Sequence, residues 1–359
     1  MGQDIWVLGA SGRSGRGIAA RLSAGGHRVV LAGRDAGRLA AVAADLDGDG
    51  GGGTGVGGVQ VVSGSLAEVL AQLRSAEPAV VVSTVGPFGR TAAQVVDACP
   101  PGTSYVDIGN ELSGTQAVLD RHDHALAQGS TFVTAAGFGA LATETAAIVV
   151  CAGRAVPSAL RVDAVPSLAS AGDPIGQALA GSILDGAPDG GRRVRGGRLV
   201  RFPVAGARRV LTTPDGATVT TASLPSGELL AAWRASAAPS VESATSAIPS
   251  GLAVRAVFPA MGVALRSPAL RRQAIARLAR VRLPTETRPR EWSWGHARAQ
   301  WSDGTVREVW LRLGDAQEFT VAAAAEVAAR LLAPPRHGAF TPAALFGPSL
   351  ATDLGAELI

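Results

Sequence analysis

Short apolar runs alternate with longer segments of mixed polarity over about the first 135 residues. The short runs are rich in β-branched residues and typical of buried strands; they begin at Ile5 and continue with Val29–Ala32, Val59–Val62, Val80–Thr84, Ser104–Ile108 and Thr131–Ala135. The longer segments have helical spacing; they are Gly15–Ala24, Gly37–Ala44, Leu66–Arg74, Thr91–Ala98 and Thr115–Gln128. This alternation predicts an α/β domain, a doubly wound parallel sheet with helices on both faces.

The pattern changes after Gly139, where strand-like runs follow one another. The expected strands are Leu160–Val165, Arg198–Val204, Val210–Thr213, Thr218–Ser223, Trp292–Gln300 and Val306–Leu313. Turn residues at Thr213–Gly216 and Ser302–Gly304 join two pairs of them. Helical patterns cover Ala264–Val281 and Phe319–Leu332, and Pro334 and Pro335 follow the second. This part predicts a second, α+β domain with a mixed or antiparallel sheet, and 359 residues are enough for two domains.

A glycine motif links the first strand to the first helix. Gly9, Gly12 and Gly15 form G-x-x-G-x-x-G, with Ser11, Arg13 and Ser14 between them. The first glycine allows a tight turn, the second lets a pyrophosphate approach the backbone, and the third lets the helix pack closely. The helix N-terminus adds N–H donors and a positive dipole. Because the motif follows a strand and opens a helix, it predicts a Rossmann dinucleotide site made of these six residues.

The end of the second strand indicates which dinucleotide is bound. Arg34 stands nineteen residues after Gly15, where a carboxylate would bind the ribose of NAD. An arginine there suits the 2′-phosphate of NADP, with Arg13 as a second donor. Asp35 leaves NAD open, since its carboxylate would favour NAD if it pointed at the ribose. We expect NADPH (NADP) to be the cofactor.

Three further strand ends carry unusual glycine-rich loops. They read "VVSTVGPFGR" (81–90), "YVDIGNE" (105–111) and "TAAGFGALATE" (134–144). Ligands of doubly wound sheets bind beyond the strand ends, so we expect six of these residues to line the nicotinamide site: Thr84, Gly86, Pro87, Phe88, Gly137 and Phe138. The alternative is that these glycines only turn the chain.

The charged residues exclude several kinds of chemistry. All 33 basic residues are arginines, which excludes lysine Schiff-base catalysis, a Walker phosphate loop and a Tyr-x-x-x-Lys reductase dyad. The net charge is +4, with scattered arginines. In the densest cluster, arginines alternate along one expected exposed strand, a pattern typical of a solvated face. We therefore expect no nucleic acid partner. The cluster comprises Arg192, Arg193, Arg195, Arg198 and Arg201.

Cysteines and apolar runs point to an intracellular protein. Cys99 and Cys151 lie far apart in apolar surroundings, and we expect both to be reduced core residues. No metal-ligand spacing is visible among Cys and His, so no metal is expected. No uncharged apolar run reaches about 18 residues, and the strand at Ile5 leaves no room for a signal peptide. We therefore expect a cytoplasmic protein without a membrane span, and a glycine-rich surface loop at Asp47–Gly58.

The order of these motifs resembles the saccharopine dehydrogenase/reductase-like family, including its trans-acting enoyl reductase branch. The resemblance rests on "GASGRSG", "LAGR", "VVSTVGPFGR", "YVDIGNE", "AGFGALATE" and the C-terminal "GAFTPAALFG". The resemblance implies a Rossmann domain over residues 1–140 and a substrate and dimerisation domain over residues 141–318. It also implies that the C-terminal segment, residues 319–359, packs back on the first domain, and that the protein forms a homodimer. Family members often carry Gly-Phe-Asp where this chain has Gly137, Phe138 and Gly139.

Hydride transfer also needs a proton source, and few side chains could provide one. We weigh Glu111 past the fifth strand, His296 between two tryptophans, and Tyr105 as catalytic candidates. Asp107 and Glu144 lie near the same strand ends. A structural hydroxyl for Tyr105, a packed ring for His296, and solvent as the donor remain alternatives.

The leading hypothesis is an NADPH-dependent reductase of a C=N bond in a small-molecule or carrier-bound substrate. The alternatives are an enoyl (C=C) reductase of a lipid or polyketide intermediate, a non-catalytic NADP sensor, and an atypical short-chain reductase. Four tryptophans near the expected hairpin either pack a core or dimer contact or line an apolar substrate site; they are Trp292, Trp294, Trp301 and Trp310. An amino-dicarboxylate substrate would need arginine clamps such as Arg234 and Arg298.

Overall fold

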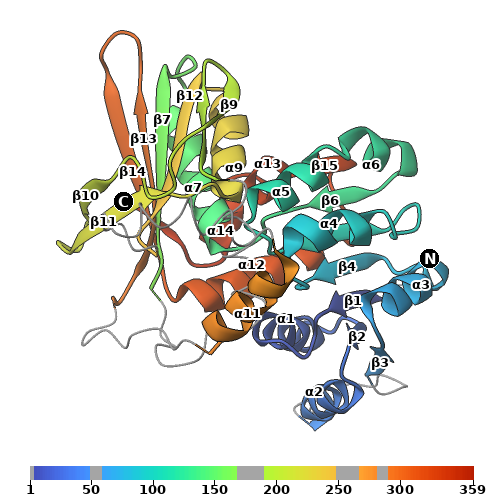
Figure 1. Ribbon diagram of the computed structural model, residues 1–359. Helices are drawn as coiled ribbons and strands as arrows, with labels where there is room; N and C mark the ends of the chain where they lie inside the picture. The colour runs from blue at the N-terminus through green and yellow to red at the C-terminus, as the bar shows by residue number, and fades with distance from the viewer. Residues whose placement is uncertain (1–3, 49–58, 168–189, 248–266, 281–289) are drawn as a thin grey trace.

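Two β-sheets lie side by side in the computed structural model of the chain (Figure 1). The structure describes residues 4–48, 59–167, 190–247, 267–280 and 290–359. Most of the glycine-rich stretch Asp47–Gly58 and both ends of the expected helix Ala264–Val281 therefore lie outside the described residues. The remaining expected elements can be compared directly.

The first sheet is a seven-stranded parallel sheet with the order β15-β6-β5-β4-β1-β2-β3. Its strands are β1 Ile5–Leu8, β2 Val29–Gly33, β3 Gln60–Ser63, β4 Val80–Ser83, β5 Ser104–Asp107, β6 Thr131–Val133 and β15 Gly338–Phe340. The sheet confirms the predicted doubly wound α/β domain, and all six expected N-terminal strands are present.

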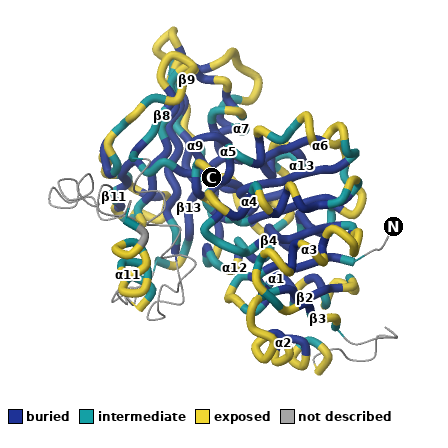
Figure 2. Tube along the Cα trace, turned by 45° about the vertical axis from the view of Figure 1, so that its right-hand side comes forward, coloured by how far each residue is buried: buried dark blue, intermediate teal, exposed yellow. Residues whose placement is uncertain are grey.

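Helices cover both faces of this sheet because its strands are apolar on both sides. Ile5 and Val7 of β1 belong to one core, and Trp6 and Leu8 to the other. The first core packs under α1 Arg13–Ala24, α2 Ala36–Gly48 and α12 Ala316–Arg330. The second packs under α3 Leu66–Ala76, α4 Phe88–Val96, α5 Leu112–Leu119 and α6 His122–Gln128. Figure 2 shows the buried strands between the more exposed helices.

The second sheet has nine strands and mixed directions, as expected. Its main path is β10-β11-β12-β7-β13-β14-β16, and β8 and β9 extend it beside β12. β12 runs parallel to β7, and the other pairs are antiparallel. The strands are β7 Ala159–Val165, β8 Arg192–Arg195, β9 Arg198–Arg201, β10 Arg209–Thr212, β11 Thr218–Ser223, β12 Ser240–Thr245, β13 Ser293–Gln300, β14 Val306–Leu313 and β16 Glu357–Leu358.

Helices α7 Phe138–Cys151 and α9 Gly227–Ser236 share a hydrophobic core with one face of the second sheet. The C-terminal part of the chain returns to the first sheet: α12 packs against α1, and β15 pairs with β6. The remaining helices are α11 Pro268–Leu278, α13 Pro342–Phe346 and α14 Ser349–Asp353. Among the described helices, none combines the length and apolar character needed to cross a bilayer.

Several local expectations were wrong. The stretch after Gly137 was expected to be a loop, but it opens α7, whose side chains are buried nearly all round and so lack an amphipathic period. The expected helix Thr115–Gln128 divides into α5 and α6 at Arg121, whose guanidinium binds the Ala117 carbonyl and Asp97. The arginine cluster lies on a two-stranded hairpin, not on one strand, because Gly196 and Gly197 turn the chain with positive φ.

The contact between α7 and β13 depends on a residue without a side chain. A Cβ atom at Gly295 would lie 2.8 Å from Ala142 on α7, closer than real Cβ contacts allow. We expect Gly295→Ala to lower the free energy of unfolding by about 1–3 kcal/mol, because the helix must shift. Urea unfolding followed by circular dichroism measures the change.

Gly314→Ala is the matched control, because no atom lies within 4 Å of a Cβ at this position. We expect it to change the free energy of unfolding by less than about 1 kcal/mol. Equal effects of the two substitutions would contradict the account of this contact.

Candidate functional site

Two glycines of the first turn are required by packing. Gly9 has φ +82°, and a Cβ there would lie 2.5 Å from Thr84 Oγ1. A Cβ at Gly15 would lie 2.3 Å from the Gly9 carbonyl oxygen. Thr84 supports the same turn, since its hydroxyl donates to the Leu8 carbonyl at 2.9 Å. The chain can therefore turn tightly between β1 and α1 only with glycine at these positions.

Gly12 is different, because a Cβ there would contact only the Gly9 carbonyl oxygen, at 3.2 Å. Its outer side is open, and it is the N-cap residue of α1. As a glycine, it contributes no side-chain hydrogen bond to this helix end, and the first N–H groups of an α-helix have no partner within the helix. Open backbone and helix N–H donors fit the pyrophosphate of a dinucleotide.

The Asp35 side chain, which follows β2, is held by the start of α2. The Asp35 carboxylate accepts a hydrogen bond from the Arg38 backbone N–H at 3.0 Å, so it caps α2. The Arg38 guanidinium donates to the Ser11 carbonyl at 2.9 Å, which places a cation beside the glycine turn. Arg34 is exposed at the strand end. Sequence reasoning missed Arg38, which lies in the first turn of α2, four residues after Arg34.

A buried carboxylate, Asp107, organises the ends of β5 and β6. Its Oδ1 accepts hydrogen bonds from the N–H groups of Gly109 and Ala135 and from the Thr134 hydroxyl, at 2.9–3.0 Å. Its Oδ2 accepts the Tyr105 hydroxyl at 2.8 Å. Burial raises the pKa of Asp107 to about 6 although these donors oppose the rise. Tyr105 is fully buried in the core, and its hydroxyl holds Asp107.

Glu111 joins two of the glycine-rich loops. Its carboxylate accepts the backbone N–H groups of Phe88 at 3.0 Å and of Asn110 at 3.2 Å. A negative charge at the start of α4 is favourable because of the helix dipole. Phe88 is buried against Gly109 and follows the cis Gly86–Pro87 bond. Glu111 thus fixes the loop around Phe88.

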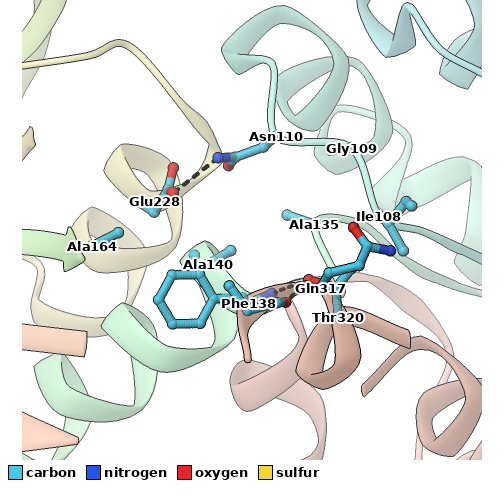
Figure 3. Close-up of a pocket in the computed structure, with 13 residues that line it drawn as sticks. Ile108, Gly109, Asn110, Ala135, Phe138, Ala140, Ala164, Glu228, Gln317 and Thr320 are labelled. Carbon is cyan, nitrogen blue, oxygen red and sulfur yellow. Dashed lines mark hydrogen bonds between the residues drawn. The ribbon is translucent and has the colours of Figure 1, made fainter. Parts of the chain in front are cut away.

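A pocket of about 200 Å³ lies where these loops meet the second domain (Figure 3). Its thirteen lining residues come from the β5 and β6 loops, the N-terminus of α7, strand β7, and the starts of α9 and α12. They are Ile108, Gly109, Asn110, Ala135, Gly137, Phe138, Gly139, Ala140, Ala164, Glu228, Ala316, Gln317 and Thr320. Gln317 connects it to the glycine turn, because its amide donates to Ser14 Oγ at 3.0 Å.

The pocket contains two of the expected cofactor residues, Gly137 and Phe138. The other expected cofactor residues and the candidates Glu111, Tyr105 and His296 lie outside its lining. Its acidic residue, Glu228, was not identified from the sequence. Glu228 lies in the first turn of α9, and its carboxylate accepts the Asn110 side-chain amide at 2.8 Å. No sequence signal marks it, because the contact joins residues 118 positions apart.

His296 belongs to a buried network within the second sheet. It is 1% exposed, its Nδ1 lies 3.1 Å from Asp163, and its ring stacks on Trp310 at 4.1 Å. Arg161 also binds Asp163. Trp294 meets Trp310 edge to face, so these two tryptophans pack on the sheet.

Both cysteines are free; Cys99 is buried and Cys151 is partly buried. Among the described residues, no group of three or more His, Cys, Asp or Glu side chains could hold a metal ion.

The first domain is similar in sequence to a known family of NADP-binding domains. Residues 5–133 match the family model of the saccharopine dehydrogenase NADP binding domain. The match confirms the predicted family resemblance and the NADP-binding class of this domain. The trans-acting enoyl reductases of Mycobacterium tuberculosis (strain ATCC 25618 / H37Rv) and Mycobacterium bovis (strain BCG / Pasteur 1173P2) are each 30% identical over 145 residues. The alignments cover 39% of this chain and 34% of each relative, about a third of the relatives' length.

Two solved structures are also similar. GenD2 from gentamicin A biosynthesis, in complex with NAD, has a TM-score of 0.42 and 13% identity, covering 98% of this chain and 92% of its own. YwfH, an NADPH-dependent reductase involved in bacilysin biosynthesis, has a TM-score of 0.33 and 11% identity, covering 37% of this chain and 76% of its own.

The geometry of Asp107 predicts different outcomes for two substitutions. Asp107→Asn can keep its oxygen toward Gly109, Thr134 and Ala135, while its amide donates to the Tyr105 hydroxyl. Asp107→Ala leaves these buried donors without an acceptor. We expect the Ala variant to be less stable than the Asn variant by at least about 3 kcal/mol, measured by urea unfolding. Equal stability of the two variants would show that these hydrogen bonds contribute little.

Asp107 also predicts a pH dependence. Its folded-state pKa of about 6 lies above the ordinary value of 3.8. The unfolded chain therefore loses this proton first, and the stability from this group falls as pH rises between those values, by up to about 3 kcal/mol. We expect the wild type to lose stability relative to Asp107→Asn over this range. A constant difference in unfolding midpoint across these pH values would contradict the prediction.

Proposed function

We propose that this protein is an NADPH-dependent reductase of a polarised double bond in a small-molecule or carrier-bound substrate. The observation that carries the proposal is the continuity between the glycine turn and the pocket through Gln317. A dinucleotide held by the turn would extend along the ends of β4 and β5 toward the pocket. The family match of residues 5–133 supports the same cofactor.

Each part of the cofactor has residues suited to it. Arg34 and Arg38, with Arg13, would hold the 2′-phosphate, and Gly12 with the start of α1 would hold the pyrophosphate. The nicotinamide would lie near Gly137 and Phe138, with the loop of Gly86 and Pro87 beside it. Bound NADPH supplies a hydride, and the protein positions the acceptor and provides a proton.

The reduced bond is part of the proposal. Reduction of a C=N bond remains the first candidate. A C=C bond is the second, because the relatives that align with this chain over 145 residues are named enoyl reductases. We place substrate binding and dimer formation in the domain of residues 141–318. A non-catalytic NADP sensor would bind NADPH and reduce nothing.

Binding of the two nucleotides tests the cofactor site. We expect Arg34→Ala and Arg38→Ala each to weaken NADPH binding about tenfold to a hundredfold, because one charge-assisted hydrogen bond contributes about 1.5–3 kcal/mol. NADH lacks the 2′-phosphate, so its affinity should not change. Fluorescence titration measures both affinities.

Arg74→Ala is the control, since Arg74 is an exposed arginine on α3. Equal losses for NADPH and NADH, or a loss in the control, would contradict the assignment of the 2′-phosphate site. A wild type that binds neither nucleotide would overturn the reductase proposal.

A further inference from the structure

One oxygen of the pocket's buried carboxyl group lacks a partner. Glu228 is 5% exposed. Its Oε1 accepts the Asn110 amide, whereas Oε2 has no hydrogen-bond partner among the described residues. A buried polar atom without a partner is unfavourable, and a catalytic role is one explanation for such an atom in a native protein.

The neighbouring residues are arranged around this carboxyl group (Figure 3). A Cβ atom at Gly139 would lie 2.1 Å from Glu228 Oε1, so a side chain on this turn of α7 would collide with it. Asn110 holds the start of α9 twice: its side-chain amide donates to Glu228, and its carbonyl accepts the Gly227 N–H at 2.9 Å. The position of the carboxyl group is therefore well defined.

Glu228 is also the one ionisable side chain among the described residues that line the pocket. Asn110, Gln317 and Thr320 are the other polar lining side chains, and none of them releases a proton near neutral pH. A reaction in this pocket that consumes a proton has Glu228 or water as its source.

We propose that Glu228 is the proton donor of the reduction, a role that rests on the proposed reductase function. The Glu228 carboxyl group gives its proton to nitrogen, which receives the electron pair of the C=N bond as the hydride adds to carbon. One C–H and one N–H bond form, while the C=N π bond, the carboxyl O–H bond and the C–H bond of NADPH that carried the hydride break. The products are the amine, NADP⁺ and the Glu228 carboxylate, which takes a proton from water. For an activated C=C bond, the proton goes to the carbon next to the activating carbonyl.

The surroundings favour a carboxyl group that keeps its proton. Burial raises the pKa of Glu228, although the hydrogen bond from Asn110 opposes the rise; the nearby Ser226 hydroxyl donates to the Leu224 carbonyl instead. The elements around Glu228 carry three other ionisable groups, which are Glu111 in the β5 loop, Glu144 on α7 and Arg234 on α9. In the described structure none of these three forms an ion pair or hydrogen bond with Glu228, so no cation there stabilises its carboxylate.

Infrared difference spectroscopy of the full chain against Glu228→Gln tests the protonation state without a substrate. Glutamine keeps the acceptor for Asn110 and removes the proton. We expect a protonated-carboxyl band, lost in the variant, that persists above pH 4.5, the ordinary pKa of a glutamate. Titration of this carboxyl group at its ordinary value would overturn the proposal.

Single-turnover oxidation of NADPH tests the chemical role, with 2-methyl-1-pyrroline and crotonyl-CoA as probes. We expect Glu228→Gln to bind NADPH like the wild type and to slow oxidation by about 10²–10⁴-fold. Glu144→Gln is the control, because Glu144 is a buried glutamate outside the pocket lining; its rate should stay within about threefold of the wild type. If the rate of Glu228→Gln also stays within about threefold of the wild-type rate, the proposal is overturned in favour of water as the proton donor.

The two experiments separate the failure of this inference from that of the proposed function. A wild type that binds NADPH and oxidises it with neither probe counts against the reductase function for these substrate classes. The infrared titration would still decide whether Glu228 holds a proton.

Discussion

The site depends on a single buried carboxyl group, Asp107, at the end of β5. It accepts hydrogen bonds from its own strand, its own loop and the loop after β6. Ala135, next to it, has φ +60°, which a non-glycine residue adopts only where its surroundings enforce it. The two loops that follow carry the pocket's Gly109 and Gly137. Because Asp107 fixes both loops, the pocket is positioned by the sheet.

The same loops connect the two sheets. Asn110 follows the β5 end and binds the start of α9, while Thr320 of α12 accepts the Phe138 N–H at the start of α7. Gln317, one turn before Thr320, reaches Ser14 beside the glycine turn. The N-termini of α7, α9 and α12 therefore meet around one cavity, and α12 contacts the start of α7 through Thr320 and the start of α1 through Gln317. A dinucleotide and a substrate approaching from opposite domains would meet at this junction.

The fold could largely be predicted from sequence because local patterns encode it. The apolar runs at Val80–Ser83 and Ser104–Asp107 and the turn at Gly9 carry short-range signals of buried strands and a tight turn. Helix α7 could not be predicted, since burial on nearly all sides removes the amphipathic period. The residues expected to bind the cofactor could be predicted in part, because Arg34 lies nineteen residues after Gly15, where Rossmann domains contact the ribose of the cofactor. Arg38 was missed because its contact with Ser11 spans 27 positions.

Glu228 shows why the chemistry of such a site is hard to read from sequence. A glutamate in the first turn of a helix usually serves the helix dipole and remains in solvent. Here the start of α9 is bound by Asn110, so the carboxyl group lies within the protein against Gly139. The Glu228 carboxyl group thus occupies the space that a side chain at residue 139 would need, although 89 positions separate the two residues in the sequence. A longer side chain at residue 139 would require the carboxyl group to leave, and α9 would then have to move away from α7. The raised pKa of Glu228 is consequently a property of how α9 packs against α7 and the β5 loop, which no local stretch of the sequence encodes.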